Sequence, residues 1–335
     1  MGFDLLNIEP HKISRDLSGY ITYIYGAPKV GKTSLAVQAP DCLLLAFERG
    51  YNAISGVRAV DIASWGDMKK VFKELKKPEV RAAYKTLIVD TVDLAAKYCS
   101  KFICSLNDVQ ELGDITYGKG YSLMRNEFEE IFNSLAQMDY AIIFIGHDET
   151  KTITPPVGCG EPYDTIVPAL SPDKVRAIIA NMADIYGYAH TPKSVDGSHQ
   201  PAILTIRDNT KIITCGSHFP YMKDEIVFSY QSLVDEINRA IDEDEAHGAE
   251  VIDKAPAVVY EEKNFAELKE QFDSLVEKVS SNVSEEDWEN VWGPKIASIV
   301  SQCLGNKKVA DLNESQVDQM DLVVSMLLDE IGNGI

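Results

Sequence analysis

Residues 26–33 read Gly-Ala-Pro-Lys-Val-Gly-Lys-Thr and satisfy the pattern G-x-x-x-x-G-K-[ST] in full. An apolar run at residues 20–25 precedes this stretch, and helix-forming residues follow it from Ser34. Glycines let backbone N–H groups turn inward around phosphate oxygens, and the helix that follows directs its positive end toward the same point. The sequence therefore predicts a strand, a phosphate-binding loop and a helix, in that order.

The loop residues have separate expected roles toward a nucleoside triphosphate. Lys32 is expected to reach the terminal phosphates, and the Thr33 hydroxyl is expected to ligate magnesium. ATP and magnesium are therefore the expected cofactors. The residues expected to surround the nucleotide are Gly26, Ala27, Pro28, Lys29, Val30, Gly31, Lys32, Thr33 and Ser34.

Apolar runs alternate with helical patterns along the first two thirds of the chain. This alternation is typical of an α/β fold, in which a mostly parallel sheet carries helices on both faces. Apolar side chains between residues 122 and 138 share one stripe, which predicts a helix packed on the core. The expected strands are residues 20–25, 42–47, 86–90, 141–146, 184–188 and 202–206, and the expected helices are residues 65–75, 92–107 and 122–138.

Three of these strands end in polar residues, at the sheet edge where open α/β folds bind ligands. Asp90 is expected to hold magnesium directly or through water, with a helix cap as the alternative. Asp93 is a second candidate for either role. Glu48 suits a general base for water, with pairing to Arg49 as the alternative. His147 suits a sensor of the terminal phosphate, with a simple turn residue as the alternative.

The composition indicates an ordinary globular chain. Of its 335 residues, 45% are apolar and 25% are charged, which is enough for a sizeable core. No apolar stretch approaches the length of a membrane span, and the N-terminus lacks the basic segment of a signal peptide. We therefore expect a cytoplasmic protein that binds no membrane. The six cysteines form no C-x-x-C pair, so neither disulfides nor a zinc site is expected.

The formal net charge of −20 is unevenly distributed. Residues 1–230 carry −4 of it and residues 231–335 carry −16. The shift begins in a polar run that is too charged to bury and is broken by glycine and proline. This pattern predicts an acidic linker over residues 242–262.

The linker divides the chain into two expected parts. Residues 1–241 hold the strands, helices and strand-end residues described above, and are expected to form the core domain. Residues 263–335 show apolar positions at helical spacing, and Ser284 begins a capping pattern. We expect a small acidic helical domain or tail there, which either stabilises the chain or docks a partner protein.

Four stretches accompany the phosphate loop: Phe47-Glu-Arg-Gly50, Leu87-Ile-Val-Asp-Thr-Val-Asp93, Phe144-Ile-Gly-His-Asp-Glu-Thr-Lys151 and Asp114-Ile-Thr-Tyr-Gly-Lys-Gly-Tyr-Ser122. Taken together, these stretches and the loop resemble the RecA superfamily. Within that superfamily the chain is similar to phage-encoded RecA-like ATPases, whose studied relatives promote annealing of single-stranded DNA in recombination. The resemblance covers roughly residues 10–240 and implies a RecA-like P-loop core.

The resemblance implies a role for each residue of the nucleotide site. Lys32 and Thr33 bind phosphate and magnesium, and Asp90 supports the metal. Glu48 activates water, and His147 serves as the sensor. These implied roles agree with those drawn from the residues alone.

RecA-like proteins hold single-stranded DNA with two mobile loops, and the matching segments are residues 113–121 and 148–168. Both are rich in glycine or proline, so irregular loops are expected. Because the core has no basic run and the chain is acidic, we expect weak DNA affinity, with ordinary solvated loops as the alternative. The candidate DNA-binding residues are Tyr117, Lys119, Tyr121, Lys151 and Tyr163.

The resemblance also implies a homo-oligomer, either a ring or a filament, in which basic residues reach a neighbour's nucleotide. Arg207 and Lys211 are the candidates for this trans role, and His218 stands where an arginine is more usual. A plain surface strand is the alternative for this segment.

We therefore expect an ATPase that anneals or remodels single-stranded DNA during phage recombination, in the cytoplasm of the host cell. The alternative is a nucleotide-gated adaptor or loader in phage replication or packaging, which docks a protein partner through its acidic tail. A small-molecule kinase is less favoured, because no arginine-rich lid segment is visible.

Overall fold

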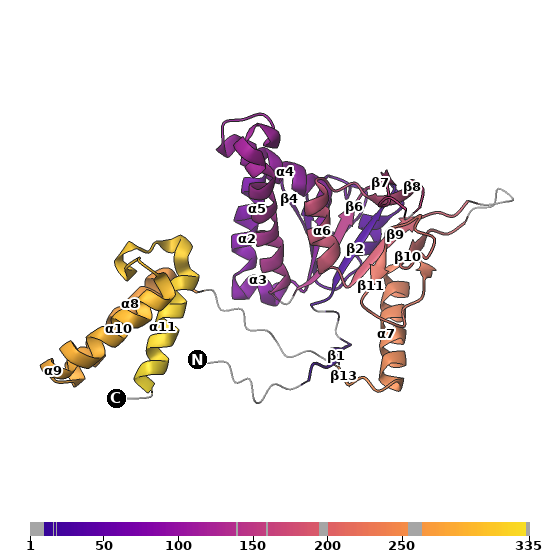
Figure 1. Cartoon of the computed structure of the whole chain (residues 1–335). Coiled ribbons are helices and arrows are strands. Elements are labelled where there is room, and N and C mark those ends of the chain that lie inside the picture. The colour runs from indigo at the N-terminus through magenta and orange to yellow at the C-terminus, as the bar shows by residue number, and fades with distance from the viewer. Residues whose placement is uncertain are drawn as a thin grey trace. The chain divides into compact units, whose positions relative to one another are not determined.

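The computed structural model describes residues 10–15, 17, 19–138, 140–158, 160–193, 200–253 and 263–332. These residues belong to two compact units, one within residues 11–253 and the other within residues 263–332. The first unit combines a sheet with helices, and the second consists of helices (Figure 1).

Nine strands form the main sheet within the described part of the first unit, in the order β12-β10-β9-β2-β6-β5-β3-β4, with β11 also paired to β9. The neighbours from β9 to β4 are parallel, while β10, β11 and β12 form antiparallel pairs. This mostly parallel sheet confirms the predicted α/β class. The strands are β2 (Ile21–Gly26), β3 (Cys42–Ala46), β4 (Ala59–Asp61), β5 (Thr86–Asp90), β6 (Ala141–Gly146), β9 (Ile185–His190), β10 (Ile203–Thr205), β11 (Gly216–Ser217) and β12 (Glu225–Val227).

Helices cover both faces of this sheet, because side chains alternate along each strand. In β2, the Tyr23 ring centroid lies 6.4 Å from that of Phe144 in β6, and the Phe144 ring also lies 5.4 Å from the ring of Phe132 in α5. Ile24 packs on the opposite face, in a cluster with Leu35 of α1 and residues of α7. The helices of this unit are α1 (Lys32–Ala36), α2 (Trp65–Leu75), α3 (Pro78–Ala83), α4 (Val92–Leu106), α5 (Lys119–Ala136), α6 (Asp173–Met182) and α7 (Tyr230–Ala246).

The apolar stripe predicted between residues 122 and 138 is the buried face of α5. Phe128 stacks on Trp65 of α2 with ring centroids 5.8 Å apart, and lies 4.6 Å from Phe132 one turn later. Residues four apart are neighbours on a helix, so the stripe forms one aromatic contact surface. The buried members are Met124, Phe128, Ile131, Phe132 and Leu135.

The segment expected to be an irregular loop at residues 148–168 is mostly regular, which corrects that prediction. It forms an antiparallel hairpin of β7 (Asp148–Ile153) and β8 (Tyr163–Pro168). Glycine and proline are concentrated toward the tip, whereas the flanks are rich in threonine and β-branched residues, which favour strands. The composition of the whole segment therefore indicated a loop, although its two ends form strands.

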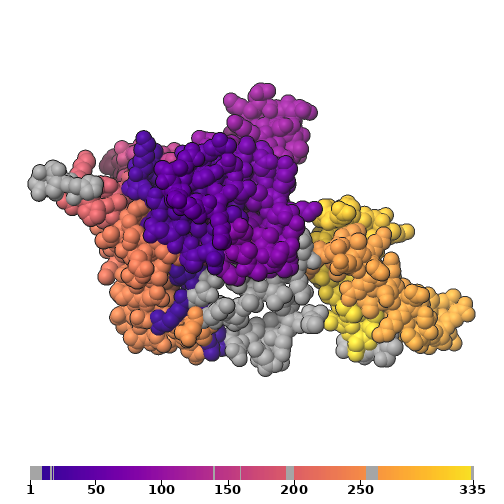
Figure 2. Space-filling model, turned by 180° about the vertical axis from the view of Figure 1, so that it is seen from behind, coloured from indigo at the N-terminus to yellow at the C-terminus, as the bar shows by residue number. Residues whose placement is uncertain are grey.

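The other expected loop, at residues 113–121, is also compact. It contains the short turns η1 (Leu112–Asp114) and η2 (Thr116–Gly118) and then the start of α5. A Cβ on Gly120 would lie 2.2 Å from the Leu112 carbonyl oxygen, so glycine permits the turns to pack closely on the helix. The segment between α4 and α5 projects from the rest of this unit (Figures 1 and 2).

The start of the predicted linker is also corrected. Helix α7 continues through Ala246, and β13 (Val251–Ile252) pairs with β1 (Ile13–Ser14). Buried Ile237, Ala240 and Ile241 give this helix an apolar face. Arg15 pairs with Asp242 and Glu245 in the last turns of the same helix. Gly248, at φ +102°, then follows the helix end. Residues 254–262 of the predicted linker lie outside the described residues.

The second unit packs its helices around a core of its own. Trp292, Ile296 and Leu327 belong to this core, and Ser284 accepts a hydrogen bond from the Asp287 N–H as the predicted cap. Neither these helices nor those of the first unit, within the described residues, have the length and apolar character needed to cross a bilayer. The elements are α8 (Phe265–Asn282), α9 (Glu285–Asp287), η3 (Trp288–Trp292), α10 (Gly293–Leu304), η4 (Val309–Asp311), η5 (Glu314–Gln316) and α11 (Val317–Gly332).

Candidate nucleotide-binding site

The predicted phosphate loop joins β2 to α1 at the carboxyl edge of the parallel strands. Gly26 has a φ of +153°, and a Cβ on it would lie 2.2 Å from the Ala189 carbonyl oxygen of β9, so only glycine fits there. Gly31, at φ +103°, is the N-cap of α1 and makes no side-chain cap. The first turn of α1 also lacks acidic residues. The loop and the first turn of α1 therefore carry no acidic side chain of their own, and the start of a helix offers its free backbone N–H groups to a phosphate.

Lys32 is buried at the centre of the loop. Its Nζ donates hydrogen bonds to the carbonyl oxygens of Gly26 at 2.6 Å and Ala27 at 2.8 Å. Burial lowers the pKa of Lys32, and four nearby carboxylates oppose this shift because they favour the charged amine. Those carboxylates belong to Asp90, Asp148, Asp93 and Glu48.

Thr33 and Asp90 meet beside this lysine. The Thr33 Oγ1 donates a hydrogen bond of 2.6 Å to Asp90 Oδ2. Burial raises the pKa of Asp90, and the Thr33 hydrogen bond opposes that shift. Hydroxyl and carboxylate oxygens are the hard donors that magnesium prefers, so this pair fits the ion. Within the described residues no cluster of three His, Cys, Asp or Glu forms a metal site.

The segment after β3 runs directly past this pair. The backbone N–H groups of Phe47 and Glu48 donate to the Asp90 carbonyl oxygen at 2.7 and 3.2 Å. A Cβ on Gly50 would lie 3.9 Å from Thr33 Oγ1, so the chain stays close to the loop after Glu48 as well. Glu48 itself is exposed, and Arg49 pairs with Asp61 at 3.0 Å instead of with Glu48. The fold therefore holds the Glu48 backbone at the site and leaves its carboxylate on the solvent side.

The Asp93 carboxylate contacts His147 at two atoms. The His147 backbone N–H donates to Asp93 Oδ1 at 3.3 Å, and His147 Nδ1 lies 3.1 Å from Asp93 Oδ2. Asp93 is 7% exposed. The structure thus gives Asp93 a contact with His147 and makes Thr91, not Asp93, the N-cap of α4. Support of the metal by Asp93 stays a prediction.

The first set of candidate DNA-binding residues lies on the projecting segment between α4 and α5. The Tyr117 side chain is 95% exposed and Tyr121 is 48% exposed, and Lys119 is exposed between them. Tyr121 borders a hollow of about 560 Å³ between α5 and α6. Its cationic lining residues are Arg125 and Lys174.

The second set lies on the β7–β8 hairpin and is more tightly paired. Lys151 forms an ion pair with Asp173 of α6, so its charge is already compensated. Tyr163, at the start of β8, is 37% exposed and borders a hollow of about 580 Å³ together with Lys211. The structure therefore brings a ring and a cation together at the hairpin tip, but places Lys151 within β7, opposite Thr165.

The two trans candidates differ in what they contact. Arg207 donates to the carbonyl oxygens of Phe219 and Pro220 at 2.6 and 2.8 Å, which ties it to its own chain. Lys211 is exposed. His218 Nδ1 lies 3.1 Å from Asp184 Oδ1, another contact within the chain. Lys211 and His218 are thus both exposed, whereas Arg207 is half-buried.

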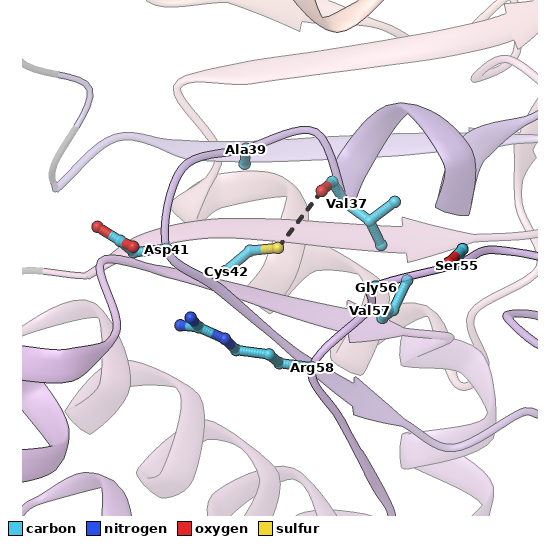
Figure 3. A pocket seen from close by; sticks show the side chains of 8 residues that line it. All are labelled: Val37, Ala39, Asp41, Cys42, Ser55, Gly56, Val57 and Arg58. Carbon is cyan, nitrogen blue, oxygen red and sulfur yellow. Dashed lines mark hydrogen bonds between the residues drawn. The ribbon is translucent and has the colours of Figure 1, made fainter.

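A smaller hollow of about 240 Å³ lies away from the loop, where α1 ends and β3 begins (Figure 3). Cys42 borders it, and the Sγ atom lies 3.5 Å from the Val37 carbonyl oxygen. Burial raises the pKa of the Cys42 thiol, which disfavours the reactive thiolate. Cysteines within the described residues are all free thiols, and Cys159 lies outside those residues.

Sequence reasoning missed Arg125 and Lys174 beside the projecting segment. Arg125 is four residues after Tyr121 on α5, so helical spacing alone was a signal that the two share a face. Lys174 carries no such signal, because its position depends on the packing of α6 against α5. The hairpin contact of His147 with Ala169 was missed for the same reason.

Comparisons with known proteins place this site in a wider group. Residues 18–218 match the family described as AAA domain, and that match includes the phosphate loop, Glu48, Asp90 and His147. The chain is 28% identical over 342 residues to the SPbeta prophage-derived uncharacterized protein YorG of Bacillus subtilis (strain 168), with 98% of this chain and 99% of that protein covered. The crystal structure of the flagellar accessory protein FlaH from Methanocaldococcus jannaschii matches with a TM-score of 0.35 and 12% identity, over 63% of this chain and 85% of that one.

Proposed function

We propose, since this chain belongs to the AAA domain family, that it binds ATP with magnesium, hydrolyses it, and uses the cycle to anneal or remodel single-stranded DNA in phage recombination. The observation that carries the nucleotide part is the 2.6 Å bond between Thr33 and Asp90, next to the buried Lys32. The prophage origin of a relative matched over 98% of the chain supports the phage setting.

Each residue of the site has one task in this proposal. Lys32 and the backbone N–H groups of the loop hold the phosphates, and Thr33 with Asp90 holds the magnesium ion. Magnesium, when bound, draws negative charge from the phosphate oxygens during transfer to water. Glu48 orients that water through its carboxylate, which stands on the solvent side of the loop. His147 reports the terminal phosphate to the hairpin that follows it.

The DNA part of the proposal rests on the projecting segment. Exposed tyrosine rings stack on bases of any sequence, and neighbouring cations follow the phosphate backbone. Tyr117, Lys119 and Tyr121 supply rings and a charge, and Arg125 with Lys174 extends the cations along the α5–α6 hollow. Because the chain carries a net charge of −20, the binding is weak for one chain and gains strength from a homo-oligomer with several such segments.

Phosphate release from ATP, with and without single-stranded DNA, tests the proposal. The assay uses magnesium and low salt, so that weak phosphate contacts are not screened. We expect turnover that DNA stimulates and that Lys32→Ala abolishes, while Lys77→Ala, a change in a surface ion pair with Glu74, leaves it intact. Turnover that ignores DNA argues against the recombination role, and no turnover by the full-length protein under any condition argues against hydrolysis.

A second candidate is a nucleotide-gated adaptor in phage replication or packaging. The uneven charge favours it, because −16 of the net charge falls on residues 231–335, which include the second unit. Deleting residues 254–335 separates the two, since this cut leaves the β1–β13 pair complete. If the truncated protein keeps DNA-stimulated turnover, the recombination role is supported. If it loses binding to a partner protein while its basal turnover is unchanged, the adaptor role is supported.

A further inference from the structure

His147 is held at three atoms by two different parts of the fold. Asp93, in the first turn of α4, contacts the His147 backbone N–H at 3.3 Å and its Nδ1 at 3.1 Å. On the other side, the Ala169 N–H donates to the His147 carbonyl oxygen at 2.8 Å. Asp93 is only 7% exposed, so the His147 ring is held by a buried carboxylate.

The contact with Asp93 sets the tautomer of the ring. An ionised carboxylate only accepts hydrogen bonds, so His147 Nδ1 must carry the proton that faces Asp93 Oδ2. In the neutral ring, Nε2 is then an acceptor. His147 directly follows β6, whose last residues pair with Tyr25 of β2 and Asp90 of β5. It therefore lies at the same edge of the sheet as the phosphate loop and Asp90.

His147 immediately precedes the hairpin. Asp148 is the first residue of β7 and is paired with Pro168 at the end of β8, one residue before Ala169. Arg176 of α6 closes the other side of this base, since it donates to the Pro168 carbonyl oxygen at 2.9 Å and pairs with Glu149 at 3.1 Å. A displacement of His147 thus changes bonds at the base of the hairpin directly.

We propose that Asp93 is a positioning residue that fixes His147 so that nucleotide at the phosphate loop alters the β7–β8 hairpin. This inference rests on the proposed function, because it assigns a purpose to nucleotide binding at that site. The hairpin tip carries Tyr163 next to Lys211 and a hollow of about 580 Å³, so the coupled element is also a candidate binding surface. Coupling of this kind needs one element with two arrangements that both sites influence.

The variant Asp93→Asn tests the positioning directly. Its amide donates where the carboxylate accepted, so the Nδ1–H tautomer loses its partner and the Nε2–H tautomer is favoured. Nitrogen-15 spectra of histidine-labelled full-length protein distinguish the two tautomers, and His147→Gln identifies the signal among the six histidines. Asp164→Asn is the matched control, since Asp164 lies in the hairpin and bonds Thr152.

Amide hydrogen exchange measures the coupling. With magnesium and a non-hydrolysable ATP analogue, we expect slower exchange in both the phosphate loop and β7–β8 of the wild type, by about threefold or more. In Asp93→Asn we expect the loop effect to remain and the hairpin effect to be lost. Asp93→Glu keeps the carboxylate and is expected to restore part of the hairpin effect, a rescue that a merely structural role does not predict.

The outcomes separate this inference from the proposed function. If nucleotide fails to slow exchange in the wild-type phosphate loop, the proposed nucleotide binding is wrong. Slowed exchange in the loop but not in the hairpin overturns only the coupling. An unchanged His147 tautomer in Asp93→Asn overturns the positioning role. Should that variant fail to fold by circular dichroism, His147→Gln carries the same exchange test, and a retained hairpin response there overturns the proposal.

Discussion

Two regions of the first unit differ in how far their side chains are buried. One is the nucleotide edge, which comprises the phosphate loop at residues 26–33 and Asp90, and the other is the projecting segment between α4 and α5. At the nucleotide edge Lys32 is 7% exposed and Asp90 is 4% exposed, and each is hydrogen-bonded. On the projecting segment Tyr117 is 95% exposed. Phosphoryl transfer requires atoms held in a fixed geometry, whereas stacking on single strands tolerates many geometries. Substitutions at the first region should therefore act steeply on turnover, and those at the second should act gradually on affinity.

The sharpest test of this contrast is Lys32→Ala. Removing a buried cation that faces the transferred phosphate is expected to lower kcat/KM for ATP by about 100- to 1,000-fold. Phosphate release measures the loss, and thermal unfolding checks that the fold survives without the bonds to Gly26 and Ala27. If kcat/KM falls by less than about tenfold in a folded variant, the two regions do not differ as proposed, because the buried site would then tolerate substitution as well as a surface does.

Glu48→Gln is expected to have the next largest effect. The amide keeps the size of the side chain but cannot accept a proton, so kcat should fall by about 100-fold while nucleotide affinity stays within about threefold. Single-turnover phosphate release and a nucleotide-binding titration separate the two quantities. Since Arg49 pairs with Asp61 and not with Glu48, Arg49→Gln is the control. Equal losses in the two variants speak against a general base at Glu48.

Tyr117→Ala should have a smaller effect, and on a different quantity. Loss of one stacking ring is expected to weaken binding of single-stranded DNA by about fivefold, from roughly 1 kcal/mol per base stacked, and to leave DNA-free turnover unchanged. Tyr117→Phe keeps the ring and should bind like the wild type. Fluorescence anisotropy with a labelled oligonucleotide at low salt measures both. Identical affinity in all three proteins removes this ring from the proposed surface.

The smallest effect is expected on stability, at Glu236 of α7. Burial raises the pKa of Glu236, but hydrogen bonds from Arg239 and from the Lys223 backbone N–H prevail and lower it below 4.5. A lowered pKa means that the ionised form stabilises the fold above pH 4.5 and that this stability is lost as the pH falls through the folded-state pKa. Glu236→Gln should therefore lower the Tm by about 2–4 °C at pH 7 and by less at pH 4.

Thermal melts at both pH values check this last prediction. Glu243→Gln, on the exposed side of the same helix, is the control and should change the Tm at neither pH. A loss at Glu236 that is independent of pH attributes the effect to packing and not to charge. Turnover of the variant at a permissive temperature should match the wild type, since α7 lies outside the nucleotide edge.

Prediction from the sequence succeeded where a signal is local. The predicted strand at residues 86–90 and the predicted helix at residues 65–75 have the observed bounds, because a short apolar run and a 3.6-residue periodicity report burial within a few residues. The prediction failed at the β7–β8 hairpin, because glycine and proline near the tip indicated a loop and the two strands beside them are short. It also failed at α7, where acidic residues on the exposed face concealed an apolar stripe.

The sequence by itself determined the phosphate loop, the α/β class and the polar residues at the strand ends, because each depends on neighbours within one turn or one strand. Only the tertiary structure decided that Asp93 contacts His147, that Arg207 bonds its own chain, and that Arg125 and Lys174 line the same hollow. Those partners lie 54, 12 and 49 residues apart in the chain, so no local pattern brings them together. These residues come together because of the order of the strands in the sheet and the packing of the helices on it. Both depend on burial of apolar side chains across the whole unit.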